Sequence, residues 1–347
     1  MIQCPFCAGE LPSSVAGIEQ EILYACSNCL NPFRLRPEQG DVVANPIEGV
    51  QDIRVVAPPG SVMAGVLDTL NEALEDLPVL PEVPQRILSM VHDPLMNMSD
   101  LAKVINEDAV ISMRILKLAN SAFYASMHEI QDLATACSRV GLKMVANTVN
   151  AIANGNLYRT GDPRFRGLME SLWRNAVVTA YCADELTTMA RAGRGDVAFM
   201  AGLIHEIGKV VLLDIITVKY KGSLGRLRED PELVARVLDK YYLLVGLHVV
   251  QKWELAPELT VTTYCHRTPN MVPCEQWLPL THALCLACAV ATSAGYGVGI
   301  AEEEQGQLVL SNHPSATYLK LDAAKFDELM TTLPEKVDPL LEVFSTI

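Results

Sequence analysis

Four cysteines near the N-terminus have the spacing of a zinc site. Cys4 and Cys7 form one C-x2-C pair, and Cys26 and Cys29 form a second pair after eighteen intervening residues. Each pair presents two thiolates from one tight loop, and two pairs complete the tetrahedral shell that structural zinc prefers. We therefore expect one structural zinc per chain. Incidental or redox-active cysteines are the alternative.

The expected zinc ribbon spans residues 1–40, a segment too small to fold on its own core. Between the two pairs, a short hairpin is predicted from Ile18, Ile22, Leu23 and Tyr24. The charged residues of the segment are Glu10, Glu19, Glu21 and Glu38 against Arg34 and Arg36. This balance disfavours binding to phosphate, so a protein-docking or spacer role is expected.

The elements that follow the ribbon are predicted from composition and periodicity. Residues 41–60 contain Pro46, Gly49 and Pro58 without helical periodicity, which indicates a linker. From about Ser61, apolar residues recur at helical spacing, and Ser99 is predicted to cap one of the helices. Residues 61–300 show no alternating strand pattern, so an all-α domain is expected there. Residues 301–347 are predicted as a C-terminal extension that closes on this domain, with one or two helices over 322–345.

Composition restricts the classes of partner and compartment. The net charge of −14 disfavours a broad electrostatic contact with nucleic acid or an anionic membrane, so neither is expected as a partner. The apolar stretches Val197–Ile216 and Leu278–Ala294 contain charged or polar residues and are predicted to be buried helices, not membrane spans. Ten cysteines without a secretion signal predict reduced thiols and a cytoplasmic protein.

Short motifs follow one another along the chain in the order Leu77–Pro84, Arg114–Tyr124, Trp173–Asn175, Ala201–Lys209, Gly246–His248, Trp253–Pro257 and Tyr264–Pro269. This ordered set resembles the HDOD family, the HD-related output domain of bacterial signalling proteins. Each motif is weak alone, but their order is specific, and the resemblance covers roughly residues 62–296. It implies two helical subdomains, the first ending near residue 160 and the second, HD-like, covering 161–296.

Polar residues in the second motif allow two interpretations. Asn120, Ser121 and Tyr124 follow an apolar helical run. Polar side chains in such places usually hydrogen-bond to nearby backbone, so a structural role is predicted over ligand binding.

The resemblance also implies where an HD active site would lie. True HD enzymes hold a divalent metal with a first His, a His-Asp pair and a later Asp, and the metal generates hydroxide for phosphate ester hydrolysis. The corresponding residues here are Asn175, His205-Glu206 and Cys288. Asn replaces an imidazole, Glu is longer than Asp, and a cysteine favours softer metals.

His248 and His266 complete this degenerate HD-like pocket and leave a metal site open as an alternative. We predict instead that the histidines are structural, because a catalytic site needs several correct ligands at once. Glu206 and Lys209 are three residues apart and are predicted to form an ion pair on one helix face.

The sequence therefore favours a non-catalytic signalling protein. Its HDOD domain would bind a partner protein or a small signalling ligand, and its zinc ribbon would add a docking module. The alternative is a divergent metal-dependent phosphohydrolase of the HD type.

Overall fold

The computed structural model describes three strands and most of the helical region. The described residues are 22–25, 32–38, 41–45, 86–87, 90, 95–121, 124, 129–193, 195–219, 231–253, 255–272, 275–298 and 313–344. In the three strands only the backbone is described. The four predicted zinc ligands, the predicted helix from Ser61 and the motif Leu77–Pro84 lie outside the described residues.

The N-terminal region contains a three-stranded antiparallel sheet in the order β1-β2-β3. Strand β1 (Ile22–Ala25) pairs with β2 (Pro32–Glu38), which pairs with β3 (Asp41–Asn45). The predicted strand is present, but its partner follows the second cysteine pair instead of preceding it. Strand β3 occupies the first five residues of the segment that was predicted to be a linker. It can follow β2 so closely because two residues suffice to connect a pair of antiparallel strands.

The helical region divides into two compact units, and each is described by itself. Pro78–Ile204 and His282–Ile347 form one unit, and His205–Thr281 is the helical part of the other. The first is named the outer unit and the second the central unit, and these names imply no relative position. All regular elements described between residues 95 and 344 are helical. The all-α fold class predicted for this region is therefore confirmed.

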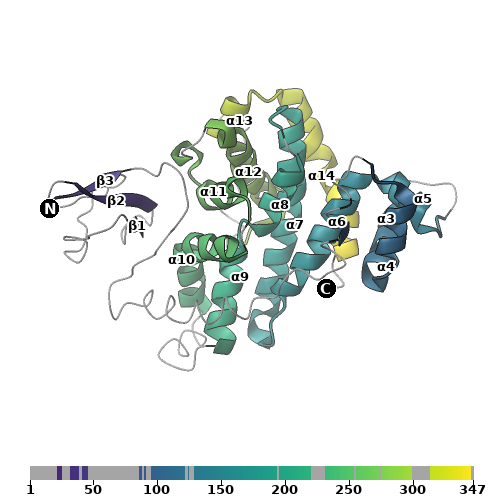
Figure 1. Ribbon diagram of the computed structural model, residues 1–347, viewed down its shortest axis with the longest axis horizontal. Coiled ribbons are helices and arrows are strands. Elements are labelled where there is room, and N and C mark those ends of the chain that lie inside the picture. Colours follow the sequence, from purple (N-terminus) through teal and green to yellow (C-terminus); the bar gives the residue numbers. More distant parts are fainter. Residues whose placement is uncertain are drawn as a thin grey trace. The chain divides into compact units, whose positions relative to one another are not determined.

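The outer unit contains most of the helices (Figure 1). They are α3 (Met98–Ile105), α4 (Ala109–Ala119), α5 (Leu133–Val140), α6 (Leu142–Gly155), α7 (Arg166–Met189), α8 (Gly195–Ile204), α13 (Pro314–Leu319) and α14 (Ala323–Phe344), with short helical turns η3 (Asn156–Tyr158), η4 (Pro163–Phe165) and η9 (Thr292–Tyr296). Helix α7 packs against α8 and α14, and α14 also contacts α4 and α6.

Short side chains set the starts of the early helices. Asn97, Asp108 and Asp132 cap α3, α4 and α5 by accepting hydrogen bonds from backbone N–H groups of the first turn. The predicted cap Ser99 is wrong by two positions, because the Asn97 side chain reaches the N–H of Asp100 and Ser99 already lies inside α3. Gly141 joins α5 to α6 at φ 84°, where a side chain would be strained.

The central unit is built from α9 (Ile207–Asp214), η5 (Ile215–Lys219), α10 (Pro231–Lys252), α11 (Pro257–Cys265), η7 (Pro269–Met271) and η8 (Glu275–Trp277) (Figure 1). Helices α9 and α10 cross closely at Gly208. A Cβ atom at Gly208 would lie 2.6 Å from the backbone nitrogen of Gly246 and would also overlap the carbonyl oxygen of Tyr242. This crossing therefore requires glycine on the α9 side.

The division into units differs from the one expected near residue 160. Helices α7 and α8 belong with the earlier helices, not with a separate HD-like half. The reason is that α7 carries buried residues along its whole length and is covered by α8 and by the distant α14. Helix α14 itself lies within the segment predicted as closing helices, over 322–345.

Helix α12 (Leu278–Ala291) begins in the central unit and continues into the outer unit. The stretch Glu275–Tyr296 is the one described helix with the length and apolar composition to cross a membrane, and half of its apolar window is buried. That pattern is also typical of a core helix in a globular protein. Ala283, Leu284, Leu286 and Ala287 have no exposed surface.

Candidate functional site

The His205-Glu206 pair lies at the turn between α8 and α9, in the central unit. Both side chains are buried, with 4% of His205 and 7% of Glu206 exposed. One turn further on, the ammonium group of Lys209 forms an ion pair with Oε1 of Glu206, and this pair is also buried. The ion pair predicted from the spacing is therefore present. Burial alone would raise the pKa of the Glu206 carboxyl, but the nearby Lys209 and His205 outweigh it and hold the pKa below its usual value.

His266 is held in one tautomer by its neighbours. Its Nδ1 atom lies 2.6 Å from the carbonyl oxygen of Thr263, which can only accept, so Nδ1 carries the proton. The lone pair of Nε2 then accepts a hydrogen bond from the Tyr242 hydroxyl at 3.2 Å. Burial, with the neighbouring His205, lowers the pKa of His266 to about 3, so the ring is neutral at physiological pH.

We call His205, Glu206, Lys209, Tyr242 and His266 the histidine cluster. Aromatic and cationic contacts also join these residues. The rings of His205 and His266 lie edge to face with centroids 5.3 Å apart. Lys209 and Arg267 each place their charged group 4.9 Å from the centroid of the Tyr242 ring. Sequence reasoning missed Tyr242 and Arg267, because neither belongs to the HD pattern.

The remaining predicted pocket residues have other surroundings. His248 lies in α10, and its buried Nε2 atom has no hydrogen-bond partner among the described residues. Asn175 belongs to α7 in the outer unit, where its amide donates to the carbonyl of Tyr296 at 2.8 Å. Cys288 is half-buried in α12, and its carbonyl accepts a hydrogen bond from the Thr292 hydroxyl at 2.9 Å.

The donors of the histidine cluster do not fit a divalent metal. Within the described ranges, no group of three or more His, Cys, Asp and Glu side chains is placed to hold one. Glu206 is already neutralised by Lys209, and the free lone pair of His266 is used by Tyr242. Oε2 of Glu206 is buried without a described hydrogen-bond partner, so the carboxylate depends on its cationic neighbours for stabilisation.

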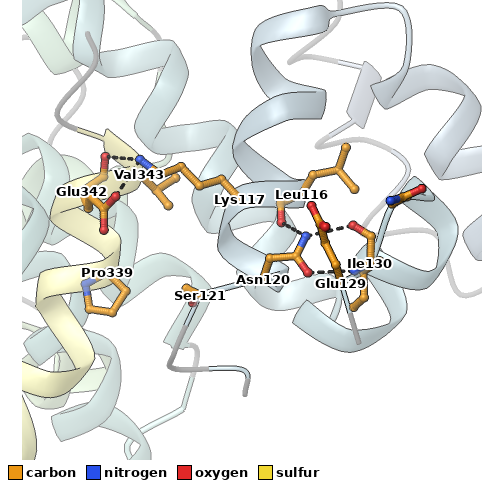
Figure 2. Close-up of a pocket in the computed structure, with 10 residues that line it drawn as sticks. Leu116, Lys117, Asn120, Ser121, Glu129, Ile130, Pro339, Glu342 and Val343 are labelled. Carbon is orange, nitrogen blue, oxygen red and sulfur yellow. Dashed lines mark hydrogen bonds and ion pairs between the residues drawn. The ribbon is translucent and has the colours of Figure 1, made fainter. Parts of the chain in front are cut away.

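A second candidate region lies in the outer unit, at the C-terminal end of α4. The Asn120 amide donates to the carbonyls of Leu116 at 3.0 Å and Ile130 at 2.8 Å, and its oxygen accepts from the N–H of Ile130 at 2.8 Å (Figure 2). The Ser121 hydroxyl donates to the carbonyl of Leu118 at 2.7 Å. These bonds to backbone are the structural role predicted for the polar residues of this motif.

The same residues form one wall of an open groove. Its volume is about 690 Å³, and α14 provides the opposite wall (Figure 2). The lining residues are Leu116, Lys117, Asn120, Ser121, Glu129, Ile130, Gln131, Pro339, Glu342 and Val343. We call this feature the α4–α14 groove. Sequence reasoning did not find it, because its two walls are more than two hundred residues apart in the chain.

Cations and an indole from the outer unit hold the end of α14. Arg114 donates to the carbonyl of Val343 at 2.7 Å, and Lys117 forms an ion pair with Glu342 at 3.0 Å. The indole N–H of Trp173 donates to the carbonyl of Phe344 at 3.3 Å. The last carbonyls of a helix lack partners within the helix, so these donors stabilise the C-terminus of α14.

Comparisons with solved structures support one fold. An HDOD domain protein of unknown function from Geobacter sulfurreducens matches with a TM-score of 0.58 and 20% identity, covering 81% of this chain and 97% of that one. A protein from Marinobacter aquaeolei VT8 described as a candidate signal transduction protein matches with a TM-score of 0.58 and 21% identity, covering 85% and 69%. A candidate metal-dependent phosphohydrolase from Shewanella amazonensis SB2B matches with a TM-score of 0.51 and 24% identity, covering 71% and 86%. At these identities the likeness establishes the fold alone.

Sequence comparison adds a family and a relative. The family model of the HDOD domain matches residues 77–269, which is more than half of the chain. An uncharacterized protein from Treponema pallidum (strain Nichols) is 27% identical over 234 residues. The match covers 63% of this chain and 43% of the relative, so the chain spans less than half of that protein's length.

Proposed function

The chain belongs to the HDOD family, and from that premise we propose that it is a non-catalytic signalling protein whose helical domain binds a partner protein or a small signalling ligand. The observation that carries the proposal is the buried pair of Glu206 and Lys209 beside the Tyr242–His266 hydrogen bond. In this arrangement the positive charge that an HD enzyme takes from a metal comes from the protein itself.

Electrostatics explains why this arrangement disfavours metal chemistry. A divalent ion bound by Glu206 would face the ammonium group of Lys209 in a site with little water, where repulsion between like charges is strong. A metal bound by Nε2 of His266 would first have to displace the Tyr242 hydroxyl. Both changes oppose metal binding, and the replacement of ligands that the family resemblance implies at Asn175 and Cys288 would oppose it further.

The alternative remains a phosphohydrolase of the HD type with altered ligands. It is kept because the structural neighbour from Shewanella amazonensis is described as a candidate enzyme of that class. Enzyme and scaffold differ in one measurable property, the turnover of phosphate esters by residues of the histidine cluster.

We also propose that Cys4, Cys7, Cys26 and Cys29 hold one structural zinc and that the ribbon serves as a docking module. The spacing of the cysteines supports the zinc site, as does the position of the second pair in the sequence. Cys26 follows β1 directly, and β2 begins three residues after Cys29, so the second pair falls in the connection between two antiparallel strands. Zinc bound there would contribute on the order of 10 kcal/mol to folding of the module.

The test measures turnover and metal content on the full-length protein. Hydrolysis of bis-p-nitrophenyl phosphate, cyclic dinucleotides and guanosine polyphosphates is assayed with Mn²⁺, beside the variant His205→Ala. We expect no difference between the two proteins. Turnover that disappears in His205→Ala would establish the phosphohydrolase instead.

Elemental analysis on the same samples tests the zinc site. We expect one zinc per chain, retained in His205→Ala and lost in Cys4→Ser. Metal that stays in Cys4→Ser and disappears in His205→Ala would place the metal in the histidine cluster and contradict both parts of the proposal.

A further inference from the structure

We propose that the α4–α14 groove, together with the exposed face of α4, is the docking site for a basic, amphipathic segment of a partner protein. This inference rests on the proposed function, because it assigns a surface and a chemistry to the partner.

The groove has the mixed lining of a peptide site. Leu116 and Pro339 are half-buried and provide the accessible apolar surface, whereas Ile130 and Val343 are buried behind it, with 8% and 1% of each residue exposed. The other lining residues are polar. Its volume of about 690 Å³ is within the range of sites that bury a ligand or a few side chains of a peptide. Figure 2 shows that the two half-buried apolar residues come from different walls, Leu116 from α4 and Pro339 from α14.

Both walls are held in place without a partner. Asn120 bonds three times to backbone and fixes the segment around Ile130 against α4. Arg114 and Trp173 hold the end of α14 through its carbonyls. A groove that is already formed loses little conformational entropy on binding, which favours affinity.

An exposed apolar stripe continues from the groove along α4. Val110 is 47% exposed and Met113 is 63% exposed, and both belong to the few large apolar side chains exposed within the described residues. Val110, Met113 and Leu116 follow one another at intervals of three residues, so each is a surface neighbour of the next along α4. Large apolar side chains gathered beside a groove mark an interaction surface, whereas single ones do not.

The charged residues at the groove indicate the sign of the charge that the partner segment carries. The positive charge of Lys117 is already paired with Glu342. Glu129 lines the groove, is exposed, and has no ion pair with any described residue. The charge left over at the rim is negative, in a chain whose net charge is −14. Lys or Arg residues beside an apolar anchor complement this rim, and an acidic segment would be repelled.

The experiment selects peptides from a random phage-displayed library against the full-length protein. Selected peptides are then measured against the double variant Met113→Ser, Glu129→Gln and against the matched control Leu95→Ser, Glu328→Gln. The control removes an exposed apolar side chain and an exposed carboxylate outside the groove lining. Circular dichroism checks that both variants keep the helical fold.

We expect selected peptides that combine large apolar residues with Lys or Arg, and an affinity that falls at least about tenfold in the groove variant but not in the control. Acidic peptides, binding that is equal in both variants, or no enrichment at all would overturn the assignment of the groove. A dimer in sedimentation experiments that the groove variant dissociates would also overturn it, because a second copy would then cover the surface. None of these results would contradict the proposal that the protein is non-catalytic. Only turnover that depends on His205 would do that.

Discussion

The histidine cluster and the α4–α14 groove use polar side chains in opposite ways. In the cluster, the polar groups of Glu206, Lys209, Tyr242 and His266 are buried and engage one another. In the groove, Asn120 and Ser121 bond to nearby backbone and leave an open surface between two helices. The region that resembles a catalytic motif therefore holds polar side chains that mainly contact one another, although Oε2 of Glu206 has no described hydrogen-bond partner. The surface that we propose for a partner is the α4–α14 groove instead.

The largest effect is expected from Gly208→Ala at the crossing of α9 and α10. The new methyl group would overlap backbone atoms of Tyr242 and Gly246, which cannot move aside as a flexible side chain does. We expect a loss of more than about 3 kcal/mol of unfolding free energy in urea denaturation. Gly167→Ala is the matched control, because its Cβ meets nothing within 4 Å inside helix α7, and it should be neutral or stabilising. Equal stability of the two variants would mean that the crossing is looser than described.

The next largest effect on unfolding free energy is expected from removing the buried ion pair of the cluster, compared with removing the exposed ion pair of the groove. Lys209→Met leaves Glu206 buried without its cation, and we expect a loss of about 3 kcal/mol. Lys117→Met removes the pair with Glu342, whose side chain is 71% exposed, and should cost less than about 1 kcal/mol. Chemical denaturation of both variants checks the difference. The double variant Glu206→Gln, Lys209→Met should recover stability relative to Lys209→Met, and failure to do so would show that the buried charge is not the cause.

The last effect is a pH dependence of stability to which His266 of the cluster contributes, and it is the smallest when expressed for each pH unit. The pKa of His266 is lowered from 6.5 to about 3 by burial and by His205, so the unfolded chain binds a proton in this range that the folded chain does not. This contribution to stability is fully present above pH 6.5 and is lost as the pH falls toward 3. We expect His266→Gln to reduce the slope of unfolding free energy between these values by about 1.4 kcal/mol per pH unit. An unchanged slope would contradict the neutral, hydrogen-bonded His266.

Local patterns in the sequence predicted several features of the fold and of the candidate sites. The all-α region, the pairing of Glu206 with Lys209 and the backbone role of Asn120 all depend on residues close together in the chain. The cap of α3 was misplaced, because Asn97 and Ser99 both suit that role and only the backbone geometry at Asn97 distinguishes them. The strand β3 was missed because a short segment rich in turn residues resembles a linker.

What the sequence by itself determined is the family and the helical periodicity. That HD ligands are replaced at Asn175, Glu206 and Cys288 stays a prediction from the family resemblance. Only the tertiary structure decided how the remaining groups are used. Tyr242 and His266 are 24 residues apart, and Arg114 and Val343 are 229 residues apart, yet each pair forms a hydrogen bond. Periodicity reports which face of a helix is buried, but it carries no information about which distant helix covers that face. The contacts within the histidine cluster and the space between α4 and α14 both depend on which distant helices pack against each other.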